Sequence, residues 1–312
     1  MGDSMAIKDR QNTYENIQKI AAFRRLYSIA KKYNNGYVML NVVMMTVLTF
    51  LSIGLNSEEL AKYFNFQQRD YSNWLAVASI IVLTIDKLII GEKIGSTREL
   101  AAKIQEKFDR EIFNLGWNST LAGSQPRVEE IVKHGEWYLR KHTDTKLRDW
   151  YAVDSDAVQH KFQILICQNS SLYWDASLRK RINYAVLIFG LLIFAAALIL
   201  CFALDLSTSA IVTNLTALLG PILDYGYNTL KENKASIANS ERLLECLDQS
   251  LTNAAQNHND AEIYKSIEAI QGQLYAKRKS DWLIPDFFYK ILRNSDESVM
   301  RLTTQQLEER LR

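Results

Sequence analysis

Cysteine, histidine and glycine are too few or too scattered in this chain to support several kinds of site. The three cysteines, Cys167, Cys201 and Cys246, form no disulfide framework, since an odd and scattered set cannot pair off. The four histidines have no metal-ligand spacing with those cysteines. The sequence also has no glycine-rich phosphate loop of the P-loop or dinucleotide-binding type. We therefore expect no metal site, no cofactor and no enzymatic activity.

Four apolar segments contain almost no charged residues, and these segments predict the fold class. They are Tyr37–Leu55, Tyr71–Ile90, Ile182–Leu204 and Leu206–Leu223. The first and third are long enough to cross a hydrocarbon core about 30 Å thick. For the second, whose uncharged run ends at Ile85, a buried core helix is the alternative. We predict an all-α integral membrane protein with two transmembrane helical hairpins, four spans in all, and a cytoplasmic helical domain.

The positions of lysine and arginine predict the orientation of these hairpins. Basic residues gather before the first apolar segment, before the third and after the fourth. The loop between the first two segments has only Lys62 and Arg69, and the turn between the last two has no basic residue. The positive-inside rule then puts both termini and the central segment in the cytoplasm. Ion and proton pathways of transporters need ionisable groups within the spans, so their scarcity here disfavours a secondary transporter.

The polar parts of the chain read as helices. Apolar residues recur at helical spacing over 92–113, and helices are also expected over 127–141, over 155–180 and beyond residue 224. No segment alternates convincingly as a strand. The predicted division is a cytoplasmic N-terminal helix (1–36), a first hairpin (37–90), a cytoplasmic helical sensor segment (91–181), a second hairpin (182–223) and a cytoplasmic C-terminal helical region (224–312).

Charges near the ends of two spans are candidates for a pore or gate. Asp86 and Lys87 follow the uncharged run of the second segment, and Leu223-Asp224 at the end of the fourth resembles Ile85-Asp86 as part of a weak internal repeat. A ring of such charges at a pore mouth is the functional interpretation. The alternative is that Asp86 and Lys87 lie at the cytoplasmic interface, with the lysine side chain reaching toward water.

Several short motifs of the central segment resemble those of a known family. In chain order they are Phe108-Asp109-x-x-x-Phe113-x-x-x-Trp117-Asn118, Pro126, Asp149-Trp150-Tyr151, Cys167-Gln168-Asn169, Trp174-Asp175 and Arg179. In this order, between two hairpins, they resemble the SMODS-associated four-transmembrane family of pore-forming effectors of bacterial anti-phage CBASS systems. The resemblance covers nearly the whole chain. It implies an effector in the bacterial inner membrane whose cytoplasmic part receives a cyclic di- or trinucleotide, made on infection by a partner nucleotidyltransferase.

A cyclic oligonucleotide needs cations for its phosphates and flat side chains on which its bases can stack. The central segment interleaves both kinds, and the predicted ligand-binding residues are Arg127, Lys133, Trp137, Tyr138, Arg140, Lys141, Arg148, Trp150 and Tyr151. The alternative is that the aromatic residues belong to the core or the membrane interface and the basic ones to a solvated face. Lys277-Arg278-Lys279 and the aromatic run after them are expected either in the headgroup region or against the cytoplasmic helices.

Four spans in one chain can hardly enclose a water-filled path, so we predict a homo-oligomer in the lipid bilayer. The resemblance implies that this assembly breaches the membrane, and the sequence leaves open whether the signal assembles subunits or gates a preformed complex. No DNA or RNA polymer is expected as a partner. The alternatives are a constitutive ion channel or transporter subunit, and a membrane scaffold whose cytoplasmic helices dock proteins.

Overall fold

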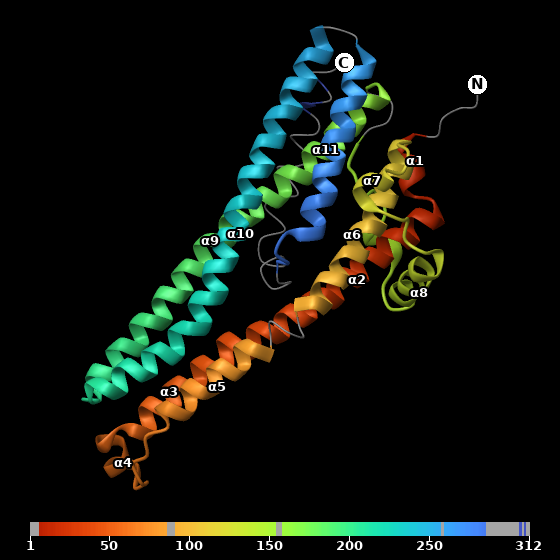
Figure 1. Ribbon diagram of the computed structural model, residues 1–312. Helices are drawn as coiled ribbons and strands as arrows, with labels where there is room; N and C mark the ends of the chain where they lie inside the picture. Colours follow the sequence, from red (N-terminus) through yellow and green to blue (C-terminus); the bar gives the residue numbers. More distant parts are fainter. Residues whose placement is uncertain are drawn as a thin grey trace. The chain divides into compact units, whose positions relative to one another are not determined.

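The protein is built from helices throughout the part of the chain that its computed structural model describes (Figure 1). The described residues are 6–85, 91–153, 158–256, 259–284, 306, 307 and 309. No strand occurs within these ranges. The chain forms two compact units, which we call unit 1 (residues 1–31, 95–179 and 235–312) and unit 2 (residues 32–94 and 180–234).

Unit 1 collects helices from three separate stretches of the chain. They are α1 (Ile7–Gln11), the first part of α2 (Tyr14–Val38), most of α6 (Gly91–Phe113), α7 (Ser119–Ala122), α8 (Val128–Leu139), the 3-10 turn η3 (Asp144–Lys146), the first part of α9 (His160–Ala203), the last part of α10 (Thr208–Gln256) and α11 (Asp260–Ser280). The helices predicted over 92–113 and 127–141 are confirmed as α6 and α8. The helix predicted from about Ser155 begins only at His160, since residues 158 and 159 are not helical, and residues 154–157 lie outside the described part.

The core of unit 1 follows from the apolar stripe of α6. Ile104, Phe108 and Ile112 recur at helical spacing and are fully buried. Phe23 of α2 contacts Phe108, with ring centroids 6.2 Å apart. Burying each such side chain contributes about 1.5–3 kcal/mol. The stripe therefore makes α6 the central helix of this core.

Charged groups inside this core are paired. Asp109 of α6 is fully buried and accepts hydrogen bonds from Arg278 at 2.5 Å and from the Tyr151 hydroxyl at 2.9 Å. Gln271 donates to Asp109 as well as to buried Glu106. Because a buried charge without a partner is costly, these contacts join α6, α11 and the segment around residue 151 in a defined arrangement.

Unit 2 contains two helical hairpins. The first consists of the end of α2, the π-helical turn η1 (Met39–Met44), α3 (Met45–Asn56), the short α4 (Glu58–Phe64) and α5 (Ser72–Ile85), with α3 and α5 side by side (Figure 1). The second consists of the end of α9 and the start of α10, joined by a turn at Asp205, whose φ of 47° is left-handed. The turn predicted at Asp205 is thus confirmed.

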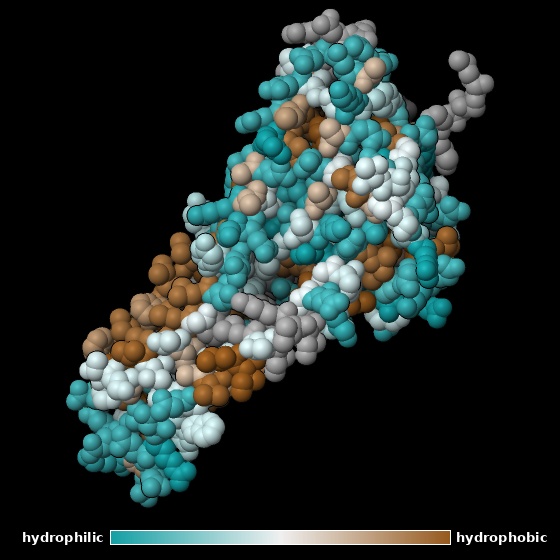
Figure 2. Space-filling view, in the orientation of Figure 1, coloured by the Kyte–Doolittle hydropathy of each residue, from teal (hydrophilic) through white to brown (hydrophobic). Residues whose placement is uncertain are grey.

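Unit 2 exposes apolar side chains that a water-soluble protein would bury. Phe189, Leu192 and Ile199 of α9 are 60%, 60% and 68% exposed. Figure 2 shows hydrophobic side chains gathered over this part of α9 and α10. A surface of this kind is typical of a helix that faces lipid.

Two helical stretches are long and apolar enough to cross a membrane, namely Tyr14–Asn56 and His160–Ala203. A shorter apolar helix lies at Ser72–Val82. In the described ranges, the segment predicted as the fourth span, at the start of α10, is not among these candidates. The helices therefore support a membrane protein, while the number of spans stays a prediction.

Candidate functional site

Unit 1 contains a cavity of about 560 Å³. Its walls come from α2, α6, the segment 145–152, α9, α11 and the residues that follow α11. Cavities that hold small ligands are typically about 300–1,000 Å³. The space is therefore suited to a ligand larger than a single ion.

One wall of the cavity is held in place by the N-terminus. The amide of Gln11 brackets the Tyr151 backbone, donating to its carbonyl at 3.1 Å and accepting from its N–H at 2.9 Å. The amide of Asn12 also makes two hydrogen bonds to one residue. It donates to the Asp149 carboxylate at 2.9 Å and accepts from the Asp149 backbone N–H at 3.0 Å. Asp149 has a left-handed φ of 50°, which turns the chain between Arg148 and Trp150. Both of these side chains line the cavity.

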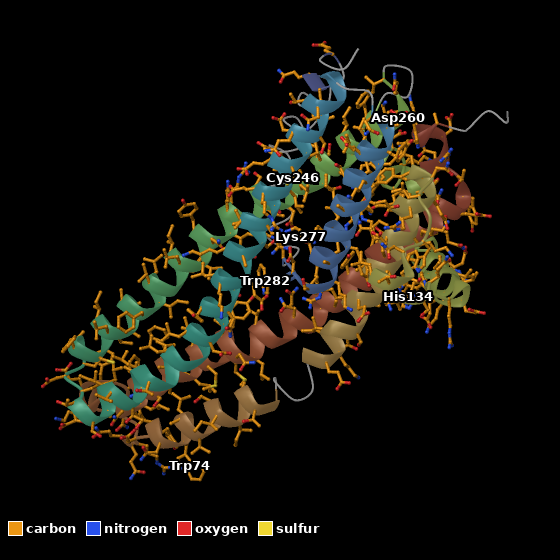
Figure 3. All side chains as sticks on the ribbon, turned by 45° about the horizontal axis from the view of Figure 1, so that its top comes forward. Trp74, His134, Cys246, Asp260, Lys277 and Trp282 are labelled. Atoms are coloured by element: carbon orange, nitrogen blue, oxygen red, sulfur yellow. The ribbon has the colours of Figure 1, made fainter. Side chains whose placement is uncertain are left out.

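Three tryptophans line the cavity, and they come from separate elements. Trp150 belongs to the segment 145–152 and Trp174 to α9. Trp282, which is labelled in Figure 3, follows α11. Trp150 packs edge-on against Phe23 at 5.2 Å, and the Arg24 guanidinium lies 5.7 Å from the centre of its ring. Such flat surfaces next to cations are the kind on which nucleobases stack.

The lining of the cavity is rich in positive charge. It includes seven lysines and arginines against three aspartates. The basic residues are Arg24, Lys31, Lys146, Arg148, Arg179, Lys277 and Arg278. Arginine and lysine bind phosphate oxygens through charge-assisted hydrogen bonds. The balance of charge therefore favours an anionic ligand.

Four of the lining residues form an ion cluster, which consists of Asp175, Arg179, Lys277 and Asp281. Arg179 donates to Asp175 at 2.9 Å and lies 3.4 Å from Asp281. Lys277 pairs with the same two carboxylates at 3.2 and 2.9 Å. The arginine and lysine side chains are only 5% and 7% exposed. Burial raises the pKa of Asp175, but the two cations outweigh it and hold that pKa below its ordinary value.

The structure brings three of the nine predicted ligand-binding residues to the cavity: Arg148, Trp150 and Tyr151. Tyr151 is also a core residue, because it is 6% exposed and its hydroxyl donates to Asp109. The other six predicted residues lie on or beside α8 and are not in the cavity lining. They are Arg127, Lys133, Trp137, Tyr138, Arg140 and Lys141.

Trp137 on α8 already has two cationic neighbours. The Arg25 guanidinium and the Lys141 ammonium lie 4.1 and 4.2 Å from the centre of its ring. The ligand-binding role of the α8 residues stays a prediction.

The pore candidates lie outside this cavity. Asp86 and Lys87 fall outside the described residues. Asp224 lies on α10, half-buried, and accepts a hydrogen bond from the Asn228 amide at 3.2 Å. Its role at a pore stays a prediction.

Sequence reasoning missed most of the cavity lining. Trp174 and Arg179 were noted only as parts of a motif, and Lys277, Arg278 and Trp282 only as a basic and aromatic stretch near the C-terminus. The signal was the same mixture of cations and aromatic residues, but Lys277 and Trp282 stand more than 100 positions after Trp150 in the sequence. Lys277 and Trp282 are 6% and 9% exposed, so this part of the C-terminal stretch packs inside unit 1.

No group of three or more histidine, cysteine, aspartate or glutamate residues in the described ranges is placed to hold a metal ion.

Comparison with known proteins gives one family and one curated relative. The family model described as "SMODS-associating 4TM effector domain" matches residues 5–307. A protein of Bacillus cereus (strain VD146), named a probable CBASS effector molecule, is 29% identical over 301 residues, which cover 94% of this chain and 95% of the relative. No solved structure matches.

Proposed function

Because this chain belongs to the SMODS-associating 4TM effector family, we propose that it is a membrane effector of bacterial anti-phage defence that a cyclic oligonucleotide activates. The ligand binds in the cavity of unit 1. The observation that carries this assignment is the chemistry of the cavity, which combines three tryptophans with seven basic residues.

The ligand class follows from this lining. A cyclic di- or trinucleotide carries one negative charge per phosphate and one flat base per nucleotide. Stacking on an aromatic side chain contributes about 1–3 kcal/mol per base. Cations such as Lys146 and Arg148 are suited to the phosphates. This role requires binding and conformational change, and no catalysis.

The proposed output is a breach of the inner membrane. Unit 2 supplies four spans arranged as two hairpins, with both termini and unit 1 in the cytoplasm. The exposed apolar surface of α9 and the apolar helices support this arrangement, as does the distribution of lysine and arginine. Several copies of the chain together enclose the pore, because two hairpins are too few to surround water.

Direct binding tests the ligand assignment. The purified, detergent-solubilised protein is titrated calorimetrically with a panel of cyclic di- and trinucleotides. We expect one of them to bind, and Trp174→Ala to raise its Kd by about tenfold or more, as loss of a stacking platform requires. Trp137→Ala is the matched control, since this tryptophan lies on α8 outside the lining. Lys146→Ala, at an exposed lining residue, gives a second test with little risk to folding.

The membrane output is measured by dye leakage from liposomes that contain the protein. Leakage only with the nucleotide that binds supports the proposed function. Leakage without any nucleotide would instead favour a constitutive channel. If the wild type, Trp174→Ala and Lys146→Ala bind the nucleotide with equal affinity, the ligand site lies outside this cavity.

A further inference from the structure

The ion cluster joins three helices at one place in unit 1. Arg179 of α9 contacts Asp281 at the end of α11 and donates to the Trp282 carbonyl at 3.2 Å. On the other side, the Ser236 hydroxyl of α10 donates to Asp281 at 2.5 Å, and Lys277 donates to the Ser236 carbonyl at 3.0 Å. The end of α11 therefore holds α9 to α10.

The position of the cluster along the chain gives this connection its significance. Arg179 is the last residue of α9 in unit 1, and Ser236 is the second residue of α10 in that unit. In the chain, the apolar part of α9 starts at Ile182, three positions after Arg179, and the apolar part of α10 ends at Leu223, 13 positions before Ser236. Within unit 1, the residues that fasten the two helices thus lie where both helices pass into unit 2.

The cluster also lines the cavity, and its charges are balanced internally. Its two cations are paired with two carboxylates, so its net charge is zero. A phosphate placed next to the two cations would meet those carboxylates as like charges. Phosphate binding here and the resting ion pairs therefore exclude one another.

We propose that the ion cluster is a phosphate-binding site of the cavity and that it also locks the resting state. Phosphates of the ligand replace the carboxylates of the cluster on Arg179 and Lys277. This exchange releases Asp281 from Arg179 and Lys277 and so removes the connection that the end of α11 makes between α9 and α10, which leaves the direct Asn183–Asn233 hydrogen bond in place. The inference rests on the proposed function, and it adds the residues that bind phosphate and the step that follows binding.

The decisive variant is Asp175→Asn combined with Asp281→Asn, which keeps the size of both side chains and removes their charge. We expect two changes. The Kd for the cyclic nucleotide falls by about tenfold, because the phosphates no longer compete with two carboxylates. In the ligand-free protein, amide hydrogen exchange in α9 around Arg179 and in α10 around Ser236 becomes faster, and liposomes leak without ligand.

Asp144→Asn is the matched control. Asp144 pairs with Arg148, another basic residue of the cavity, at 2.7 Å, but this exposed pair lies within one short segment and joins no helices of the hairpin. Ligand-free exchange of α9 and ligand-free leakage should therefore stay at the wild-type level. Arg179→Gln should raise the Kd by about tenfold while also speeding exchange in α9, because the residue serves both roles.

Exchange rates in the double variant that match the wild type would overturn the inference, and so would an unchanged Kd for a nucleotide that the wild type binds. If the wild type binds no nucleotide of the panel, the proposed function fails. The exchange rates of the ligand-free double variant then decide by themselves whether the cluster fastens the two helices.

Discussion

Replacing Asp109 by alanine should cost unit 1 a large part of its stability. The carboxylate is fully buried and accepts hydrogen bonds from Arg278, Gln271 and Tyr151. Its removal leaves the Arg278 guanidinium buried without its main counterion. Breaking a buried ion pair in this way costs about 3–5 kcal/mol. Since whole domains are stable by only about 5–15 kcal/mol, this loss is a large fraction of the total.

The measurement is urea unfolding of the detergent-solubilised protein, followed by tryptophan fluorescence. Asp144→Ala is the control, because it breaks an exposed ion pair with Arg148, and such pairs contribute about 0–1 kcal/mol. The double variant Asp109→Ala with Arg278→Met should recover much of the loss, since it removes both charges of the buried pair. A loss below about 1 kcal/mol for Asp109→Ala, or no recovery in the double variant, would refute the reasoning.

Three further predictions concern packing, pH and lipid contact. Gly135→Ala should lower the free energy of unfolding by about 1–3 kcal/mol in the same denaturation assay, because a Cβ there would lie 2.7 Å from the backbone oxygen of Gln18. Gly272→Ala should cost less, because its Cβ would meet only the end of a flexible leucine side chain, at 2.9 Å. Burial lowers the pKa of His134 below its ordinary 6.5, so below about pH 6.5 the unfolded state binds more protons at this imidazole than the folded state does. Thermal stability should therefore fall as the pH drops below about 6.5, and His134→Asn should flatten this dependence. Phe189→Lys should reduce the membrane-bound fraction after carbonate extraction, since a lysine at the centre of a span costs about 2.5–3.5 kcal/mol; full retention would contradict a lipid-facing α9.

Local patterns in the sequence determined the helical class of this protein. Two short-range signals were each sufficient to predict a helix. The charge-free run of the third segment predicted the apolar part of α9, and the helical spacing of Ile104, Phe108 and Ile112 predicted α6. Asp205 marked the turn of the second hairpin, because it is the one charge between two apolar segments. The order of short motifs in the central segment likewise indicated the family before any comparison.

Only part of the candidate site could be predicted from local patterns in the sequence. Trp150 and Arg148 were predicted, because both stand in one stretch rich in cations and aromatic residues. The same composition around Trp137 gave an equal signal on α8, outside the cavity lining. Composition shows which residues could bind an anion, but it does not show on which side of a helix they lie relative to the cavity.

The sequence by itself determined the helices, the apolar segments and the family, because each depends on neighbouring residues or on their order. Only the tertiary structure decided that Lys277 and Trp282 lie with Trp150 and Trp174 around one cavity. It also decided that Lys277 pairs with Asp175, 102 positions before it. These contacts join side chains from distant parts of the chain, and the distances between them are fixed by the packing of α9, α10 and α11 rather than by any local pattern.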